Sequence, residues 1–331
     1  MSDLAGLTLP IYDIEVFDNS ILSTFQRCPR KGFYQYGLRR APLGINYPIQ
    51  FGVAYHKFQE VIENLYKKLI VDGDKKLEDP KTQRLIYELA FSKATEVTRV
   101  FQGGVAELSW VDPPIGHDKE YLTKARLDAT CEEAFDAWIE EKREGIIEVI
   151  LSEQGFDLII SENWPVGPMR YGGRFDQLIS WNRKLWLRDF KTTTRMGKTY
   201  GQKFDPDNQM SGYVWAGGLL SGQPIEGASI ETVYNTKTKG PEFHNHLSTR
   251  TDWQIANWKE EAIDEISTVR DHFVKRTFPK RTDSCNDYGG CFFRDACRRD
   301  GWGNIQRWLE ANTVESFWDF TDPEGEEGTV D

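Results

Sequence analysis

The chain has 331 residues, enough for one large domain or two modest ones, and its 11 tryptophans, 13 tyrosines and 19 phenylalanines can build a sizeable core. Its 41 basic and 52 acidic residues give a net charge of −11, which argues against a nonspecific nucleic-acid coat protein but leaves room for an enzyme with a basic groove. No stretch approaches the ~20 apolar residues of a membrane span, and the N-terminus lacks the basic region of a signal peptide, so we expect a cytoplasmic, reducing environment and no membrane partner.

The first half of the chain is predicted to be mostly helical. Ser20 is predicted to cap the helix that begins at residue 20, and Cys131 lies on the apolar side of the helix predicted over 118–144. We expect a helical lobe over about 72–150, inserted before the sheet. The predicted elements are a short helix followed by an aromatic-rich turn over 20–36, and helices over 52–70, 78–101 and 118–144.

The second half alternates strand patterns with two helices. One helix is predicted from Pro206 to Leu220 with Asp205 as its N-cap, and the other over 252–276, opened by a Thr251/Gln254 capping box. This order of elements predicts a mixed α/β sheet rather than a regular alternation of strand and helix. The predicted strands are 156–162, 171–181, 184–191, 228–234 and 242–247.

Two of these strands are separated by two residues, 182–183, which predicts a tight hairpin because asparagine tolerates positive φ. With the turn centred there, Trp181 pairs with Lys184, and the register carries Asp176 opposite Asp189. Directly opposed residues have Cβ atoms about 4.5–5.5 Å apart, so two carboxylates would face each other.

Lys191 falls on the same face as Asp189, because side chains alternate along a strand. Opposed like charges destabilise a sheet, and hard oxygen ligands at this separation suit Mg²⁺ or Mn²⁺. A bound ion would polarise a phosphoryl oxygen, and Lys191 would stabilise the charge that develops on the phosphate. The alternative is an ordinary surface charge cluster on an edge hairpin.

"GGRFDQL" followed by "LRDFKTT" resembles the core of the PD-(D/E)XK nuclease superfamily, in particular its RecB-type branch, which also includes CRISPR-associated and AddAB-type or phage exonucleases. Further motifs are similar to that branch and occur in the same order, from residue 20 to residue 297. They are Gly52-x-x-x-His56, Gln209-x-x-x-Tyr213, and the split cysteine set Cys28, Cys285, Cys291 and Cys297.

The resemblance implies a restriction-endonuclease-like core and a role for each matching residue. His56, Asp176, Asp189 and the backbone carbonyl of Phe190 would bind the metal, and Lys191 would be the catalytic lysine. A departure from the pattern is that phenylalanine, not proline, precedes Asp176. The residues that would support the lysine or touch DNA are Gln209 and Tyr213.

Each supporting residue also has a simpler interpretation. His56 could make a local hydrogen bond near a helix N-terminus, and Tyr213 could pack under the sheet beside Gln209. Glu60 lies one turn beyond His56, where it could be a hydrogen-bond partner of that histidine or a solvated acid.

The cysteines leave a choice between cofactors. The gaps C-x₅-C-x₅-C lack the short knuckle of most structural zinc sites, whereas a [4Fe–4S] cluster tolerates varied spacing. We therefore favour a structural iron–sulfur cluster on Cys28, Cys285, Cys291 and Cys297, with zinc as the alternative and unrelated buried cysteines as the third possibility.

Basic residues interleaved with aromatics surround these cysteines, which suits single-stranded nucleic acid. These basic residues are Arg27, Arg30, Lys31, Arg39, Arg40, Lys275, Arg276, Lys280, Arg281, Arg298 and Arg299.

The predicted function is a Mg²⁺- or Mn²⁺-dependent deoxyribonuclease, exonucleolytic or end-processing, in a bacterial, archaeal or phage-infected cell.

The nuclease is predicted to act on single-stranded DNA or DNA ends in recombination, repair, phage DNA metabolism or CRISPR adaptation. The chain lacks G-x-x-x-x-G-K-[ST], so unwinding would need a helicase or recombination partner. Alternatives are a catalytically silent DNA-binding or scaffold subunit and an iron–sulfur redox sensor. We expect one nuclease domain over 1–320, with a core at 151–250, a helix and cluster-binding region at 251–300, and a disordered acidic tail at 321–331.

Overall fold

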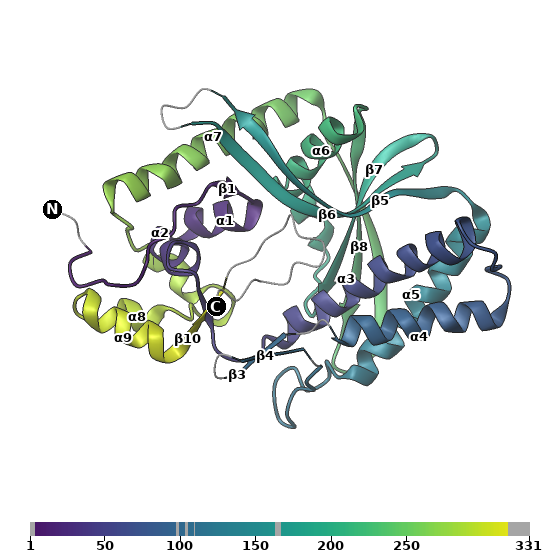
Figure 1. The fold of residues 1–331 in the computed structure, drawn as a ribbon, viewed down its shortest axis with the longest axis horizontal. Coiled ribbons are helices and arrows are strands. Elements are labelled where there is room, and N and C mark those ends of the chain that lie inside the picture. Colours follow the sequence, from purple (N-terminus) through teal and green to yellow (C-terminus); the bar gives the residue numbers. More distant parts are fainter. Residues whose placement is uncertain (1–3, 97–98, 103–104, 109, 163–166, 317–331) are drawn as a thin grey trace. The chain divides into compact units, whose positions relative to one another are not determined.

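The computed structural model describes residues 4–96, 99–102, 105–108, 110–162 and 167–316 (Figure 1). The predicted acidic tail lies outside these residues. The chain forms two compact units, described separately below: one of Met1–Leu43, Gly155–Arg174 and Asp252–Asp331, the other of Gly44–Gln154 and Phe175–Thr251. Among the described residues, no helix has the length and apolar content needed to cross a bilayer.

A mixed sheet confirms the predicted α/β fold class. Antiparallel pairing joins β6 to β7 and β8 to β9, whereas β7 and β8 run parallel. The short β1 runs parallel to the beginning of β6, and β5 also pairs with β6. The strand bounds are β1 (Val16–Phe17), β5 (Ile147–Ser161), β6 (Met169–Trp181), β7 (Lys184–Thr193), β8 (Ile225–Asn235) and β9 (Pro241–Thr249).

The β6–β7 hairpin has the predicted register. Asn182 and Arg183 both adopt positive φ, 52° and 62°, as a two-residue turn of this kind requires. Trp181 pairs with Lys184, and the ladder continues to the pair of Gln177 and Arg188. The positions that carry the two aspartates come directly after that last pair.

Three helices of the second unit pack together and onto the sheet: α3 (Tyr47–Tyr66), α4 (Pro80–Glu96) and α5 (Lys124–Glu144) (Figure 1). Their shared core includes Cys131, which is fully buried as predicted, and two residues of the sheet, Phe190 and Val233. These helices therefore share one core with the strands. The helix predicted over 78–101 ends earlier than expected, because the chain enters β3 (Arg99–Gln102), which pairs with β4 (Val105–Leu108).

A buried ion network also ties α5 to the sheet. The Arg188 guanidinium lies 2.5 Å from a carboxylate oxygen of Glu141 on α5 and 2.8 Å from one of Glu231 on β8. Burial opposes the charge of Arg188, but the two glutamates outweigh it and raise its pKa above the ordinary value. Arg188 lies on the opposite face of β7 from Asp189, so this network anchors the strand from behind the two aspartates.

Two predicted N-caps are wrong. Asp18, not Ser20, caps α1 (Asn19–Arg27) by accepting a hydrogen bond from the Ile21 N–H at 2.6 Å. Asp207, not Asp205, caps α6 (Asn208–Ser221), because its carboxylate accepts from the Met210 N–H at 3.0 Å. Each helix places an aspartate directly before its first turn, where a side-chain oxygen can reach the unpaired N–H groups.

The first unit has an aromatic core. Phe33 stacks on Phe278 at 3.9 Å between ring centroids and meets Trp302 edge-on at 5.8 Å. Its helices and short strands are α1, α2 (Pro29–Gly32), η1 (Phe33–Gly37), β2 (Arg40–Pro42), α7 (Asp252–Lys275), η4 (Thr282–Gly289), α8 (Arg294–Cys297), α9 (Trp302–Asn312) and β10 (Thr313–Glu315).

Candidate active site

Asp176 lies at the centre of a group of charged residues in the second unit. Its Oδ2 accepts a hydrogen bond from the Phe190 N–H at 2.6 Å, and its Oδ1 lies 3.3 Å from His56 Nδ1. Burial opposes ionisation of this carboxyl, but His56, Lys191 and the Phe190 N–H together lower its pKa below the ordinary value. Asp176 is therefore held as a carboxylate although it is buried.

Asp189 pairs with Lys191 two residues along the same strand. The ammonium lies 3.0 Å from Oδ1 and 2.8 Å from Oδ2 of a carboxylate that is 2% exposed. Only the Oδ1 contact has hydrogen-bond geometry, so Oδ2 keeps acceptor capacity. Burial raises the pKa of Asp189 to about 6; Lys191 opposes this shift and the nearby Asp176 adds to it.

Lys191 stays protonated in this setting. Burial alone would lower its pKa, but Asp189, Asp176 and the more distant Asp207 raise it above the ordinary value. The pKa of His56 rises to about 8, because the attraction of Asp176 outweighs the cost of burying the charge. The two predicted carboxylates, the lysine and the histidine thus form one electrostatically coupled group.

Three side chains offer donor atoms that all lie within 4.8 Å of one another: His56, Glu153 and Asp176. An imidazole nitrogen with two carboxylate oxygens is a suitable donor set for Mg²⁺ or Mn²⁺. Asp189 is outside this trio, since both its oxygens face Lys191. The Phe190 carbonyl stays a predicted ligand.

Gly52 explains how α3 brings His56 to the sheet. A Cβ atom built at this position would lie 3.0 Å from Thr192 Oγ1 on β7, closer than side chains normally approach. Glycine therefore lets the helix pack tightly on the strand that carries Asp189 and Lys191. One turn further along, His56 then reaches Asp176.

The beginning of α6 approaches the same group. Gln209 Nε2 donates to the Tyr213 hydroxyl at 2.9 Å, as expected for residues one turn apart, and the Tyr213 ring meets Phe175 edge-on. The cap of this helix, Asp207, is near enough to raise the pKa of Lys191. Gln209 and Tyr213 are thus partners of each other, and their contact with lysine or DNA stays a prediction.

A sequence model of the PD-(D/E)XK nuclease superfamily matches residues 19–298. The chain belongs to this superfamily. No curated protein matches the sequence. A solved structure described as "Crystal structure of SSO0001" is 20% identical, covers 46% of this chain and 68% of that chain, and superposes with a TM-score of 0.23.

PD-(D/E)XK nucleases use divalent metals, and one residue of the possible metal group here was not predicted from the sequence. Glu153 lies on β5 in "LSEQGFD", ahead of the strand predicted to begin at residue 156, and it has a positive φ of 48°. A glutamate in a long strand beside the hairpin was the available signal. Glu60, for which both a contact with His56 and a solvated position were considered, pairs with Lys57 at 2.7 Å.

The four cysteines of the predicted cluster lie in the first unit, all as free thiols. Burial raises the pKa of Cys291, to which Cys285 and Cys28 add, and burial likewise raises that of Cys297, to which Cys28 adds. Cys28 is therefore near enough to affect both Cys291 and Cys297, and Cys285 is near enough to affect Cys291. Within the described part of the chain, however, the four sulfurs do not form a group at metal-ligand distances, so a preformed four-thiolate site is absent there.

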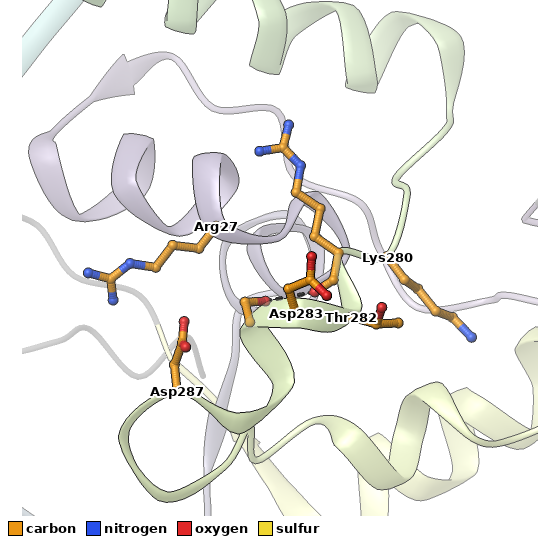
Figure 2. Close-up of a pocket in the computed structure, with 7 residues that line it drawn as sticks. Arg27, Lys280, Thr282, Asp283 and Asp287 are labelled. Carbon is orange, nitrogen blue, oxygen red and sulfur yellow. Dashed lines mark hydrogen bonds between the residues drawn. The ribbon is translucent and has the colours of Figure 1, made fainter.

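Some of the basic residues that were predicted to bind nucleic acid, all of them in the first unit, make contacts within the protein. Arg30 lies 4.7 Å from the Trp302 ring centroid, and Lys280 donates to the Cys297 carbonyl at 2.6 Å. A cavity of about 520 Å³ nevertheless opens beside them (Figure 2). Its lining residues are Arg27, Lys280, Arg281, Thr282, Asp283, Ser284 and Asp287.

Proposed function

We propose that this protein is a Mg²⁺- or Mn²⁺-dependent deoxyribonuclease of the RecB-type branch that hydrolyses phosphodiester bonds in single-stranded DNA or at DNA ends. The observation that carries the proposal is the convergence of two buried carboxylates, Asp176 and Asp189, with the half-buried Lys191 and His56 in one electrostatically coupled group. Such opposed, perturbed groups in one place are characteristic of catalytic sites.

The donor set supports a divalent cation. His56, Glu153 and Asp176 would hold it, with Asp189 beside them, and the Phe190 N–H fixes the orientation of Asp176. When bound, the ion supplies Lewis-acid polarisation of a phosphoryl oxygen and lowers the pKa of a bound water.

Lys191 would stabilise the phosphate. Its ammonium stays charged and is held by Asp189, and its side chain is a quarter exposed. A fixed cation stabilises negative charge on the transferring phosphoryl group more than a mobile one does, because no reorganisation is needed during the reaction. Gln209 and Tyr213 would orient the lysine or contact the DNA strand.

The preference for single strands or ends, and the roles in recombination, repair, phage DNA metabolism or CRISPR adaptation, rest on the resemblance to the RecB-type branch. A helicase or recombination protein is the expected partner. The alternative function is a catalytically silent DNA-binding or scaffold subunit. The intact Asp176, Asp189 and Lys191 disfavour it, since a non-catalytic module gains nothing from two buried carboxylates.

A structural iron–sulfur cluster on Cys28, Cys285, Cys291 and Cys297 is part of the proposal, with zinc as the alternative. Its support is that four free thiols lie in one unit and that nearby cations favour thiolates: Lys31 lowers the pKa of Cys291, while Lys280 and Arg30 lower that of Cys297, each against a larger effect of burial. Anaerobically purified protein should be brown and contain iron and sulfide. A colourless protein with one zinc ion would overturn the cluster.

Cleavage of end-labelled DNA tests the proposed activity. Single- and double-stranded substrates are incubated with Mg²⁺ or Mn²⁺ and either wild-type protein or Asp189→Ala. We expect the wild type to shorten the labelled strand only when a divalent ion is present, and the variant to be inactive. A wild type inactive on every DNA would favour the scaffold, and full activity of the variant would refute the assigned site.

A further inference from the structure

The first part of the segment that connects β7 to α6 is basic in an otherwise acidic protein. The connection, residues 194–207 "TRMGKTYGQKFDPD", has three basic residues before its two aspartates, Asp205 and Asp207, although the whole chain has a net charge of −11. Arg195, Lys198 and Lys203 are exposed. The segment begins three residues after Lys191, so these cations follow the candidate active site directly along the chain.

Strand register places two histidines of β9 on the face of the sheet that carries the active-site residues. Lys191 pairs with Thr232 of β8, which pairs with His244, and one row further Asp189 aligns through β8 with His246. Side chains paired across neighbouring strands point to the same face. Strands lie about 4.8 Å apart, so His244 is roughly 10 Å from Lys191 across the sheet.

The turn η3 (Tyr200–Phe204) packs on that same face. A Cβ atom at Gly201 would lie 2.3 Å from His246 Nδ1, so only glycine permits this close approach. The rings of Tyr200 and Phe204 each lie 6.1 Å from the His246 ring. The turn therefore fixes Tyr200 and Lys203 on the side of the sheet where Asp189 and Lys191 lie.

Two buried hydrogen bonds hold this turn in place. The Phe204 carbonyl accepts from Ser248 Oγ at 2.7 Å and from the guanidinium of Arg250 at 2.9 Å. The turn is therefore anchored to β9 and to the residue that follows it. Groups held in their binding conformation lose little entropy when a ligand arrives, which favours a binding role for the exposed side chains of the turn.

The exposed chemistry of this surface matches a polynucleotide strand. The Lys203 ammonium lies over the Tyr200 ring, 3.7 Å from its centroid, which places a cation on one face of an aromatic ring. The Thr232 hydroxyl, between Lys191 and His244, has no hydrogen-bond partner among the described residues. His244 is exposed, and the nearest acidic group to it is Glu242 at 3.8 Å.

We propose that Arg195, Lys198, Tyr200, Lys203 and His244 form a binding subsite for single-stranded DNA next to the scissile phosphate. The cations would bind the phosphates that follow it, and Tyr200 would stack one unpaired base. This inference rests on the proposed nuclease function, because it assigns the substrate strand to the face that carries Asp189 and Lys191. It adds the residues that favour a single strand, since a base within a duplex has no free face to stack.

The test measures binding separately from cleavage. Fluorescence anisotropy reports the affinity for a labelled 15-nucleotide oligothymidylate in Ca²⁺, at several KCl concentrations. Replacing Arg195, Lys198 and Lys203 together by glutamine should weaken binding and reduce the salt slope by about 0.7 for each phosphate that is no longer neutralised. Tyr200→Ala should weaken binding about 5- to 100-fold with an unchanged salt slope, whereas Tyr200→Phe should bind normally.

Two controls distinguish failure of the subsite from failure of the proposed function. Lys184→Gln removes a cation at the opposite end of β7, 58% exposed, and should bind like the wild type. Hydrolysis of bis(p-nitrophenyl) phosphate, which is too small to reach the subsite, should be unchanged in all variants. Wild-type affinity in the triple variant and in Tyr200→Ala would refute the subsite while leaving the nuclease intact. A wild type that binds the oligonucleotide but hydrolyses nothing would refute the nuclease.

Discussion

The Phe190 N–H donates a hydrogen bond to Asp176 Oδ2 at 2.6 Å, so the backbone of β7 fixes a carboxylate of β6. The other oxygen of the same carboxylate lies 3.3 Å from His56 Nδ1 on α3. One side chain therefore links three elements, and its orientation depends on the hairpin register. Removing its charge should disturb metal binding more than the fold.

Asp176→Asn should weaken Mn²⁺ binding at least about ten-fold, because it removes a charged ligand while keeping the volume and one oxygen. Isothermal titration calorimetry measures the affinity directly. Glu60→Gln is the matched control: Glu60 lies on the same helix as His56 but pairs with Lys57, so its loss should leave Mn²⁺ affinity unchanged. Equal affinities for Asp176→Asn and the wild type would remove Asp176 from the metal site.

Gly52→Ala should push α3 away from β7, since the new methyl group would meet Thr192 Oγ1. The expected cost is about 1–3 kcal/mol in the free energy of unfolding, with weaker metal binding because His56 moves. Thr192→Ala removes the opposing hydroxyl, so the double variant should regain most of the loss. Urea denaturation of the two single variants and the double variant measures this coupling, and strictly additive effects would contradict the close contact.

Arg250→Ala should destabilise the protein by about 2–4 kcal/mol. The buried guanidinium donates to Ser211 on α6, to Ser248 on β9 and to the carbonyl of Phe204, which would all lose a partner. Because these contacts hold the beginning of α6, kcat should fall while Mn²⁺ affinity is retained. Urea denaturation, cleavage rates and calorimetry on the same preparation check the three expectations. Unchanged kcat with reduced stability would restrict Arg250 to a structural role.

Asp18 makes stability depend on pH. Burial raises its pKa from 3.8 to about 6, against the smaller effect of the Ile21 and Ser20 N–H groups. Between these values the folded protein binds more protons than the unfolded chain, so the free energy of unfolding falls as pH rises from about 4 to about 6. Asp18→Asn keeps a capping oxygen and removes this titration, and should be about 1–3 kcal/mol more stable than the wild type at pH 7. Urea denaturation at pH 4.5 and pH 7 measures the difference, and parallel changes in both proteins would exclude the effect.

The hairpin could be predicted because its signals are local. The Asn182-Arg183 turn sets the register, and side-chain alternation then aligns the two aspartates and Lys191. Asp189 and Lys191 were consequently recognisable in one strand, and the superfamily match agrees with the motif in which they lie.

The contacts that depend on tertiary packing could not be predicted in this way. Glu153 lies near His56 and Asp176 because β5 begins earlier than the strand predicted from residue 156. Glu60 pairs with Lys57 of the same helix. The Arg188 network was also missed, because nothing in the local pattern marks an arginine that pairs with Glu141 of a distant helix. The two misplaced caps differ by two residues each, since each helix start offers two good capping residues two positions apart: Asp18 and Ser20 at α1, and Asp205 and Asp207 at α6.

In the proposed active site, Lys191 acts on the phosphate and not as a metal ligand. The most direct measurement compares Lys191→Met with the wild type in parallel assays of Mn²⁺ affinity by calorimetry and of single-turnover DNA cleavage at saturating Mn²⁺. We predict that the variant binds Mn²⁺ with wild-type or higher affinity and that its cleavage rate falls at least about 100-fold, because the fixed positive charge beside the phosphate is lost. Cleavage within a few-fold of the wild-type rate would contradict the proposed active site.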